Sequence, residues 1–480
     1  MGHRAGHSER RDVSAMGTAE QQSREPRKID PERLDRVLRA AVAAGLVGGE
    51  QVAAGFVDVD GLLRSVADLR GAFATDGVGG RAEVLHTFAA KACALVPVLR
   101  LLAATGLGCE VASAGELALA LAAGFPTGRI VLDSPAKTEA ELAQALALGV
   151  AVNADNLDEV ARIAALRGDT GGSVLGLRIN PQVGAGSIAA MSTASQHAKF
   201  GEPLRDPGAR ERITAAFARH PWLTRLHVHV GSQGCPLELI AAGVRAVHEL
   251  AEEINERAGR RQVTSIDLGG GLTVNFEGDE IRPSHRAYAD HLRAAVPGLF
   301  DGGYALVTEF GRSLVAKNGF TAAVAEYTKQ VGGRRVALTH AGAHLATRTV
   351  LMPDAWPLRI SVHRPDGSRR VPGPDDPPVV QDVAGPLCFA GDVVAHERPL
   401  PAIGPGDLVV LHDTGGYYTS APWGYNSVAR PAIHGFTTAP DGEVRFALVR
   451  ARQSVEQVVA ESGGAHADSL LGLGDARGGA

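Results

Sequence analysis

The sequence contains no long hydrophobic run and no excess of one charge, and both absences exclude classes of protein. Among its 480 residues there is no uninterrupted apolar segment of the roughly 18 residues that a membrane-spanning helix needs. Lysine and arginine number 48 against 53 aspartate and glutamate residues, a net charge of −5, and the body of the chain has no long run of one sign. This balance argues against a surface for nucleic acid or for membrane headgroups.

Cysteine is scarce and scattered. Cys93, Cys109, Cys235 and Cys388 contain no CxxC pair, a spacing that suits neither a zinc cage nor a disulfide scaffold. We therefore expect free thiols, no metal ion and a cytoplasmic protein. Residues 1–29 lack the apolar core of a secretory signal, and we predict that they form a disordered lead.

The length and the apolar content allow a large hydrophobic core. Hydrophobic residues make up 45% of the chain, which is ordinary for a globular protein. The 480 residues predict two or three domains, or one large barrel with an appendage.

Short apolar runs alternate with helical patterns through the first two thirds of the chain. In 138–148, Leu142 and Leu146 share one helix face, and Thr138 with Glu141 has the spacing of a capping box. Because parallel strands need a crossover connection, this alternation predicts a parallel sheet. Eight apolar runs, the number that closes a (β/α)8 barrel, lie at 84–90, 108–112, 129–132, 150–153, 173–179, 225–230, 263–268 and 304–308.

The pattern changes near residue 320. Alternating apolar runs, broken by Pro/Gly-rich pieces, predict a C-terminal antiparallel β domain. We expect 371–378 to be a hairpin loop, with a linker as the alternative, and 50–59 to add a strand to this domain. The predicted α/β organisation is a disordered lead over 1–29, a segment contributing to the β domain over 30–64, a barrel over 65–320, the β domain over 321–461 and a disordered tail over 462–480.

Active sites of such barrels lie at the carboxyl ends of the strands. The candidates at these positions are Lys91 after the first strand, Glu110 and Ser113 after the second, His229, Ser232 and Gln233 after the sixth, Gly269, Gly270 and Gly271 after the seventh, and Glu309, Gly311 and Arg312 after the eighth. A lone glycine triplet is more often a tight turn than an anion site. Here two glycine-bearing turns follow the seventh and eighth strands together, and their backbone N–H groups favour a phosphate ligand.

Lys91 is the only ionisable residue in FAAKACAL, and its position leaves two interpretations. It either extends its ammonium group into water, or it forms an imine, since burial lowers the pKa of an ammonium group and frees a nucleophilic amine. A lysine, a phosphate cradle and an acid, Glu309, on a neighbouring strand end are together the groups that pyridoxal 5′-phosphate requires.

Seven motifs follow one another along the chain: FAAKAC, HVHVGSQ, DLGGGL, EFGRSL, GPLCFAGD, DTGGYY and YNS. On these motifs the chain resembles the fold-type III pyridoxal-phosphate-dependent decarboxylases over about residues 55–436, most closely the diaminopimelate decarboxylases and more distantly the ornithine and arginine decarboxylases. The resemblance implies an alanine racemase-like (β/α)8 barrel with a C-terminal β domain, pyridoxal 5′-phosphate as cofactor and a small-molecule substrate that is an amino acid.

The resemblance also implies a role for each cofactor-site residue. Lys91 would hold the cofactor as an imine, and His229 would stack on the pyridine ring. Glu309 would pair with the ring nitrogen and favour the pyridinium form, which accepts the electrons released by decarboxylation. The residues implied around the phosphate are Ser232, Gly269, Gly270, Gly271, Gly311, Arg312 and Tyr417.

The family completes its active site across a homodimer, so the resemblance implies that Cys388 comes from the partner subunit. Asp392 would lie nearby, and Lys199 would meet Asp392 across the interface. Cys388 is the first candidate for returning a proton to the substrate carbon, and Lys91 is the second.

The resemblance implies that Arg312, Arg348, Met352, Phe389 and Tyr425 bind the substrate. Family members specific for diaminopimelate have a glutamate at the Phe389 position, for the distal amino group, and a tyrosine at the Met352 position, for the distal carboxylate. A phenyl ring leaves the distal ammonium unpaired in a desolvated pocket, which costs on the order of several kcal/mol. We therefore expect an α-decarboxylase either of diaminopimelate or of another amino acid or derivative with a less cationic or larger distal end.

Two other functions share parts of this pattern. A fold-type III amino-acid racemase has the same barrel, lysine and cofactor, but that family sets an arginine against the ring nitrogen, where this chain has Glu309. A non-catalytic regulatory homologue would not need Lys91, Glu309, the glycine turns and Cys388 together.

Overall fold

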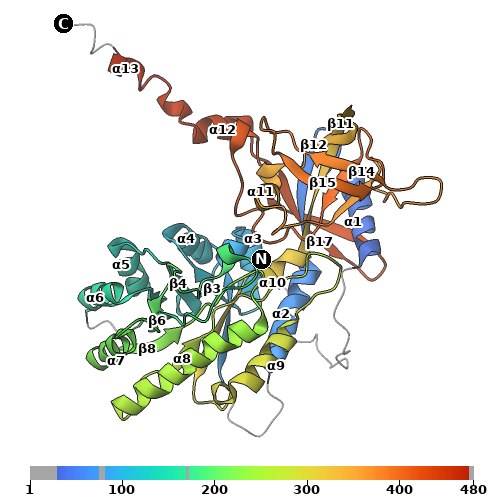
Figure 1. Cartoon of the computed structure of the whole chain (residues 1–480). Helices are drawn as coiled ribbons and strands as arrows, with labels where there is room; N and C mark the ends of the chain where they lie inside the picture. Colours follow the sequence, from blue (N-terminus) through green and yellow to red (C-terminus); the bar gives the residue numbers. More distant parts are fainter. Residues whose placement is uncertain (1–29, 75–81, 169–171, 475–480) are drawn as a thin grey trace, which may run out of the picture.

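The structure is a computed structural model that describes residues 30–74, 82–168 and 172–474. It consists of a parallel barrel and a β domain that lie side by side (Figure 1). The expected disordered lead, 1–29, lies outside the described residues. None of the described helices is long and apolar enough to cross a membrane.

Eight parallel strands close the barrel, as the sequence predicts. They are β2 (Val84–Ala89), β3 (Gly108–Val111), β4 (Ile130–Asp133), β5 (Ala151–Ala154), β6 (Leu175–Asn180), β8 (Leu223–His227), β9 (Ser265–Asp267) and β10 (Ala305–Phe310). Strand β10 pairs with β2, and β5 pairs with β6, so the sheet has no open edge. A two-residue strand, β7 (Glu202–Pro203), is added beside β6.

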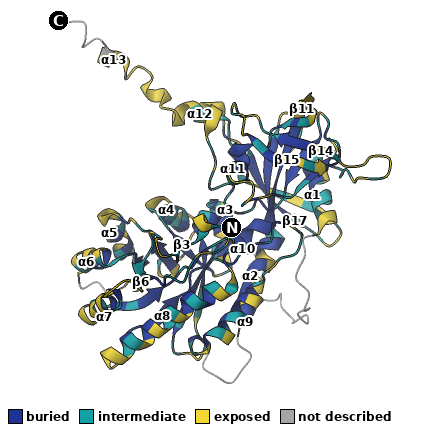
Figure 2. Ribbon diagram, viewed as in Figure 1, coloured by how far each residue is buried: buried dark blue, intermediate teal, exposed yellow. Residues whose placement is uncertain are grey.

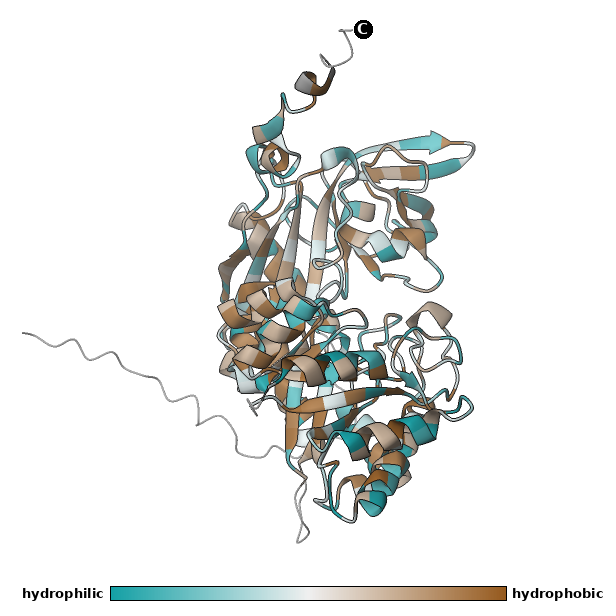
Figure 3. Cartoon of the chain, turned by 90° about the vertical axis from the view of Figure 1, so that its left-hand side faces the viewer, coloured by the Kyte–Doolittle hydropathy of each residue, from teal (hydrophilic) through white to brown (hydrophobic). Residues whose placement is uncertain are grey.

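Helices surround the barrel. They are α2 (Val59–Phe73), α3 (Val96–Ala104), α4 (Ala114–Ala122), α5 (Glu139–Leu148), α6 (Leu157–Leu166), α7 (Ala209–Arg219), α8 (Leu237–Ala258) and α9 (His285–Ala295). In α5, Thr138 and Glu141 form the predicted capping box, and Leu142 is buried. Figure 2 shows the buried residues of the barrel on its strands and on the helix faces turned toward them, and Figure 3 shows apolar and hydrophilic residues on the same helices. This is the amphipathic pattern of helices that cover a sheet.

The β domain contains strands from both ends of the described chain. Its strands are β1 (Ala53–Asp58), β11 (Gly319–Val331), β12 (Arg334–Thr339), β13 (Ile360–His363), β14 (Val379–Ala384), β15 (Val393–Leu400), β16 (Leu408–Leu411), β17 (Ala432–Thr438) and β18 (Val444–Arg450). The predicted strand at 50–59 is confirmed as β1, which pairs antiparallel with β11 and parallel with β17. The pairing of β12 with β14 is also parallel, and the other pairings of this sheet are antiparallel.

Two short helices complete the described part of the β domain. Helix α1 (Pro31–Ala43) buries Val37 and Leu38 in one core cluster with aromatic residues of β1 and β11. Helix α11 (Ala343–Leu351) follows β12 and carries Arg348. These two helices place the 30–64 segment and the predicted substrate arginine in the same domain.

Two sequence predictions for this domain need correction. Residues 371–378 contain a tight antiparallel turn between Gly373 and Asp376, but they do not join two paired strands, because they connect β13 to β14, which pair with different strands. The described part of the predicted disordered tail contains the helical turns η8 (Gly464–His466) and α13 (Leu471–Gly474), which follow α12 (Val455–Glu461) and project from the β domain (Figures 1 and 3). Backbone hydrogen bonds three residues apart, such as Leu471 N–H to the Asp468 carbonyl, form these turns without tertiary packing.

Candidate active site

Lys91 lies in the 3₁₀ turn η2 (Ala90–Ala92) directly after β2, and its side chain is partly exposed. Its Nζ donates a hydrogen bond to Glu110, the carboxylate on the neighbouring strand β3. Burial opposes the charged amine, but the carboxylates of Glu110 and Glu309 outweigh it and raise the pKa of Lys91. Burial likewise raises the pKa of Glu110, to about 7, although the charge of Lys91 opposes this shift.

The glycine turn after β9 brings three strand ends into contact. Gly270 N–H donates to His229 Nδ1 over 3.1 Å. A Cβ atom on Gly269 would lie 2.6 Å from that nitrogen, and a Cβ atom on Gly270 would lie 2.3 Å from the Glu309 carbonyl oxygen. Gly269 also has a φ of +63°. Glycine is therefore required here, because a larger residue would separate His229 from Glu309.

His229 is neutral in this arrangement. Burial and the positive charges of Arg178 and Lys91 hold its pKa well below the ordinary value. Because Nδ1 accepts the hydrogen bond from Gly270, the ring proton of neutral His229 is on Nε2.

The residues predicted around a phosphate also lie together. Arg312, at the start of α10 (Arg312–Val315), is within 3.4 Å of the Ser232 hydroxyl, and its guanidinium carbon lies 4.3 Å from the centre of the Tyr417 ring. Tyr417 N–H donates to the carbonyl of Ala92, next to Lys91. A Cβ atom on Gly311 would lie 2.8 Å from the Ala92 Cβ, so glycine allows this close approach.

Arg348 and Arg312 share one aromatic enclosure. Arg348 lies 5.2 Å from the Trp356 ring centre and 4.6 Å from that of Tyr417, and Arg312 stacks on the same two rings. Arg348 Nη1 and Arg312 Nε are buried without a hydrogen-bond partner. Burial and the neighbouring Arg348 lower the pKa of Arg312 to about 10 although Tyr417 opposes the shift. Two guanidinium groups without a carboxylate partner form a site for anionic groups.

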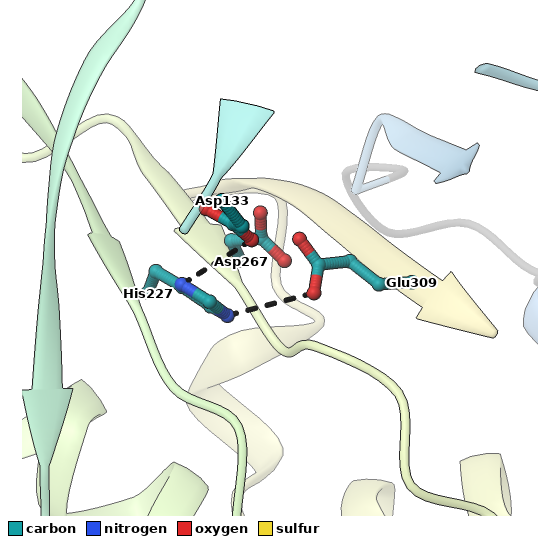
Figure 4. A group of neighbouring side chains, drawn as sticks. All are labelled: Asp133, His227, Asp267 and Glu309. Atoms are coloured by element: carbon teal, nitrogen blue, oxygen red, sulfur yellow. Dashed lines mark ion pairs between the residues drawn. The ribbon is translucent and has the colours of Figure 1, made fainter. Parts of the chain in front are cut away.

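Glu309 belongs to a cluster of titratable groups inside the barrel (Figure 4). We call Asp133, His227, Asp267 and Glu309 the His227 cluster. His227 Nδ1 lies 3.6 Å from Asp133 Oδ2, and His227 Nε2 lies 3.6 Å from Glu309 Oε2. All four side chains are buried. They come from four barrel strands, β4, β8, β9 and β10.

Three predicted residues of the β domain, Cys388, Phe389 and Tyr425, have no contact with the barrel site residues within one described chain. Cys388, in the loop between β14 and β15, is exposed, and its N–H donates to Asn426 over 2.7 Å. Phe389 packs edge-on against Trp423 at 5.3 Å and against Tyr425 at 6.4 Å, and the latter two rings are stacked. We call Phe389, Trp423 and Tyr425 the aromatic cluster. Within the described residues, no contact joins Cys388 to Lys91, His229 or Glu309.

A cavity of about 1220 Å³ lies where the barrel loops face the end of α11. Met352, which follows α11 and is 41% exposed, lines it. Loops after β6, β8 and β9 contribute Ile188, Gln233 and Phe276. Gln233 follows Ser232 directly, so this cavity continues from the predicted phosphate region.

Asp392 lies in the same loop as Cys388, as expected. Asp392 is 3% exposed, and its carboxylate accepts hydrogen bonds from the N–H groups of Ala343 and Leu387. It therefore joins the start of α11 to its own loop, and a contact with Lys199 of a second chain stays a prediction. The Lys199 ammonium lies 5.0 Å from the ring centre of Phe200.

Sequence analysis missed Asp133, His227, Asp267 and Trp356. A signal was present for the first three, because each is the last residue of its barrel strand, whereas the candidates named after β8 and β9 follow the strand end. Trp356 follows Arg348 and Met352 at intervals of four residues, which is a helical spacing, although α11 ends before it.

Comparison with known proteins gives matches along most of the chain. Residues 70–316 match the pyridoxal-binding domain of the pyridoxal-dependent decarboxylases. The diaminopimelate decarboxylase of Zymomonas mobilis is 30% identical over 392 residues, which cover 80% of this chain and 87% of the relative. That of Actinosynnema pretiosum is 33% identical over 393 residues, covering 79% and 82%.

Solved structures show the same architecture. The diaminopimelate decarboxylase of Helicobacter pylori, complexed with L-lysine, aligns with a TM-score of 0.73 at 25% identity and covers 86% of this chain and 97% of that one. The lysine/ornithine decarboxylase of Vibrio vulnificus, complexed with putrescine, aligns with a TM-score of 0.68 at 21% identity, covering 85% and 99%. The second likeness shows the fold alone.

Proposed function

The chain belongs to the pyridoxal-dependent decarboxylases, and on this premise we propose that it decarboxylates an amino acid whose distal end is less cationic or larger than that of meso-diaminopimelate. Its cofactor is pyridoxal 5′-phosphate and its reaction class is that of the amino-acid carboxy-lyases. The observation that carries the proposal is the packing of Phe389 in the aromatic cluster next to Cys388.

The side chains at the strand ends fit this cofactor. Lys91 supplies the amine, and Glu309 Oε1 is a buried carboxylate oxygen without a hydrogen-bond donor. Arg312 is buried with a free Nε. We propose that Lys91 binds the cofactor covalently, that Glu309 faces its ring nitrogen and that His229 flanks its ring. Ser232, Gly269, Gly270, Gly271, Gly311, Arg312 and Tyr417 would hold its phosphate.

When bound, the cofactor supplies an acceptor for the electrons of the bond that breaks. The chain supplies the groups that hold and donate protons. Glu110 takes the hydrogen bond of Lys91 Nζ and holds that amine in place at the barrel end. His229, neutral and fixed through Gly270, presents an uncharged ring face. Lys91 and Cys388 are the two proton donors available for the product carbon.

Cys388, Phe389 and Tyr425 would reach this site from a second copy of the chain in a homodimer. Within one described chain they lie on exposed loops of the β domain and have no contact with Lys91. The exposed position of Cys388 suits a group that acts in a neighbouring subunit. This arrangement puts the aromatic cluster at the distal end of the substrate.

An aromatic cluster favours a different distal group from a carboxylate. An ammonium group that leaves water needs a paired charge or hydrogen-bond acceptors, and Phe389 offers neither. Arg348, with its buried and unpartnered Nη1, still favours an anionic group on the substrate. The cavity beside Met352 has room for a substrate longer than a simple amino acid.

Carbon dioxide release from a panel of amino acids tests this proposal. The panel contains meso-diaminopimelate, lysine, ornithine, glutamate and amino acids acylated or arylated at the distal end. We expect carbon dioxide release from the amino acids acylated or arylated at the distal end, and little release from meso-diaminopimelate. Formation of lysine from meso-diaminopimelate at enzyme-like rates would sink the substrate proposal, and loss of optical rotation without carbon dioxide would indicate a racemase.

A further inference from the structure

The His227 cluster contains more carboxyl groups than its surroundings can neutralise (Figure 4). One side-chain atom from each of Asp133, His227, Asp267 and Glu309 lies within 4.8 Å of the corresponding atoms of the others, and all four residues are buried. Three buried carboxylates at this spacing repel one another and have lost their water. Such a group needs cations, donors or protons in compensation.

Among the described cations around the cluster, Arg225 and Arg178 are not paired with another acid. Arg225, on β8, is buried and donates its Nε to Ser265. Lys91 after β2 is paired with Glu110 of β3, and Lys137 after β4 is paired with Glu159 at 3.0 Å. The other charged or titratable groups that face the cluster are Arg178 of β6, which stacks on Phe200, and His229, which is neutral. Two guanidinium groups therefore face three carboxyl groups, and one negative charge is left without a cation.

Asp267 is fully provided with hydrogen-bond donors. Its Oδ1 accepts from Gly269 N–H over 3.0 Å, and its Oδ2 accepts from the Asn153 amide over 3.1 Å. Each oxygen of the Asp267 side chain therefore has a hydrogen-bond donor.

Asp133 and Glu309 have no such donors. Both Asp133 oxygens and Glu309 Oε1 are buried without a hydrogen-bond partner, and the two carboxyl groups lie within reach of each other. His227 lies between them, with one nitrogen 3.6 Å from each. Two facing carboxyl groups satisfy each other only when one of them carries a proton.

We propose that Asp133 and Glu309 form an acid pair that carries one proton, that this proton is bound to Glu309, and that Asp133 is a positioning residue acting on the cofactor only through Glu309. Neutral His227 lies between the two carboxyl groups, with one ring nitrogen 3.6 Å from each, and holds them in place. The inference rests on the proposed place of Glu309 beside the ring nitrogen. It adds a second carboxyl group that controls which protonation state Glu309 has before the cofactor binds.

The charges in the cluster support this location of the proton. Burial and the negative charges of Asp133 and Asp267 raise the pKa of Glu309 well above its ordinary value. Burial acts on Asp133 in the same direction, but its contacts with His227 and Glu309 outweigh it and lower its pKa. Burial also lowers the pKa of His227, so the imidazole does not take the proton.

Infrared difference spectroscopy of the full chain tests the pair, in the cofactor-free and the cofactor-loaded protein. All proteins compared carry Glu110→Gln, because Glu110, with a pKa of about 7, would add a C=O band of its own at neutral pH. We expect the cofactor-free protein at neutral pH to show the C=O band of a protonated carboxyl group, shifted in heavy water. The band should be lost in Glu309→Gln, which has no acid there. It should also be lost in Asp133→Asn, whose amide can donate to Glu309 and leave it ionised. Loading with pyridoxal 5′-phosphate should change the band in the protein that carries Glu110→Gln alone.

Asp155→Asn is the matched control, because Asp155 is a buried carboxylate that accepts from Gly201 N–H outside the cluster, and it should keep the band. The spectrum of the protein with Glu110→Gln alone decides the matter even if a further variant does not fold: absence of the band at neutral pH overturns the pair. A band that survives in both Glu309→Gln and Asp133→Asn also overturns it. So does a tightly held Zn²⁺ or Mn²⁺, found by metal titration of the wild type and lost in Asp133→Asn. None of these readouts needs the substrate, so they can fail independently of the proposed decarboxylation.

Discussion

The barrel strand ends and the aromatic cluster of the β domain differ in how their residues are held. At the strand ends, Lys91, His229 and Glu309 are fixed by neighbouring strands, glycine turns and buried charges. In the aromatic cluster, Tyr425 is 40% exposed, and the rings contact mainly one another. On the proposed function, the barrel would hold the cofactor and the exposed loops would determine which substrate reaches it. Substitutions should separate the two.

The largest effect is expected from Lys91→Ala. Without the amine no imine can form, so the imine absorbance and all decarboxylase activity should be absent, although phosphate contacts would still allow weak cofactor binding. Absorbance spectra with added pyridoxal 5′-phosphate give the measurement. Lys199→Ala, which removes a lysine packed on Phe200, is the control with a normal spectrum. An imine that can be reduced by borohydride in Lys91→Ala would contradict the assignment.

Glu309→Gln should leave the imine intact and slow the reaction. A buried group that stabilises developing charge typically contributes about 10²–10³-fold in kcat, and we expect a loss of this size. The cofactor should still be bound through Lys91, as shown by peptide mapping after borohydride reduction. A kcat close to that of the wild type would remove Glu309 from the ring-nitrogen position.

Cys388→Ala tests whether a residue of the β domain acts together with the barrel residues of a second chain. We expect kcat to fall by about 10²-fold or more, as for loss of a proton donor, with an unchanged cofactor spectrum. Mixing Cys388→Ala with Lys91→Ala should restore activity, because a mixed dimer would contain one site with both residues intact. Failure to regain activity in demonstrated mixed dimers would mean that both residues act within one chain.

Phe389→Glu should change substrate preference and nothing in the barrel. A carboxylate in the aromatic cluster can pair with a distal ammonium, and a charged hydrogen bond contributes about 1.5–3 kcal/mol. We therefore expect kcat/KM for meso-diaminopimelate to rise by about tenfold or more. Phe389→Leu, which adds no charge, should show no gain. Equal kcat/KM values for the two variants would show that Phe389 does not line the distal pocket.

The smallest effect concerns stability and pH. Burial raises the pKa of Glu110 to about 7, so the folded chain binds this proton more tightly than the unfolded chain does. The stabilisation is complete below the ordinary glutamate pKa and is lost as pH rises through about 7. In urea unfolding of the cofactor-free protein from pH 5 to 8, Glu110→Gln should show a shallower decline with pH. An identical decline in both proteins would contradict this.

Sequence alone predicted the barrel well because its signals are local. Each of the eight strands is an apolar run. The spacing of Thr138 and Glu141 predicted a capping box at the start of α5, and the structure confirms it. The positions of Lys91, Glu309 and the glycine turns followed from barrel geometry, because carboxyl ends of parallel strands meet at one face.

The misses involve contacts between segments far apart in the sequence. The hydrogen bond that Asp392 accepts from Ala343 N–H, 49 residues away, could not be predicted from the sequence. The proximity of Asp133 to Glu309 depends on barrel closure, which no spacing in the chain encodes. The loop 371–378 could not be assigned because the partners of β13 and β14 lie elsewhere in the sheet.

Borohydride reduction followed by peptide mapping tests most directly whether the barrel alone holds the cofactor. The wild type, Cys388→Ala and Phe389→Leu would be loaded with pyridoxal 5′-phosphate, reduced and digested. The account predicts a pyridoxyl group on Lys91 in all three proteins and to the same extent. A label on another lysine, or one that disappears when the β-domain loop is changed, would contradict the division between chemistry in the barrel and selection in the aromatic cluster.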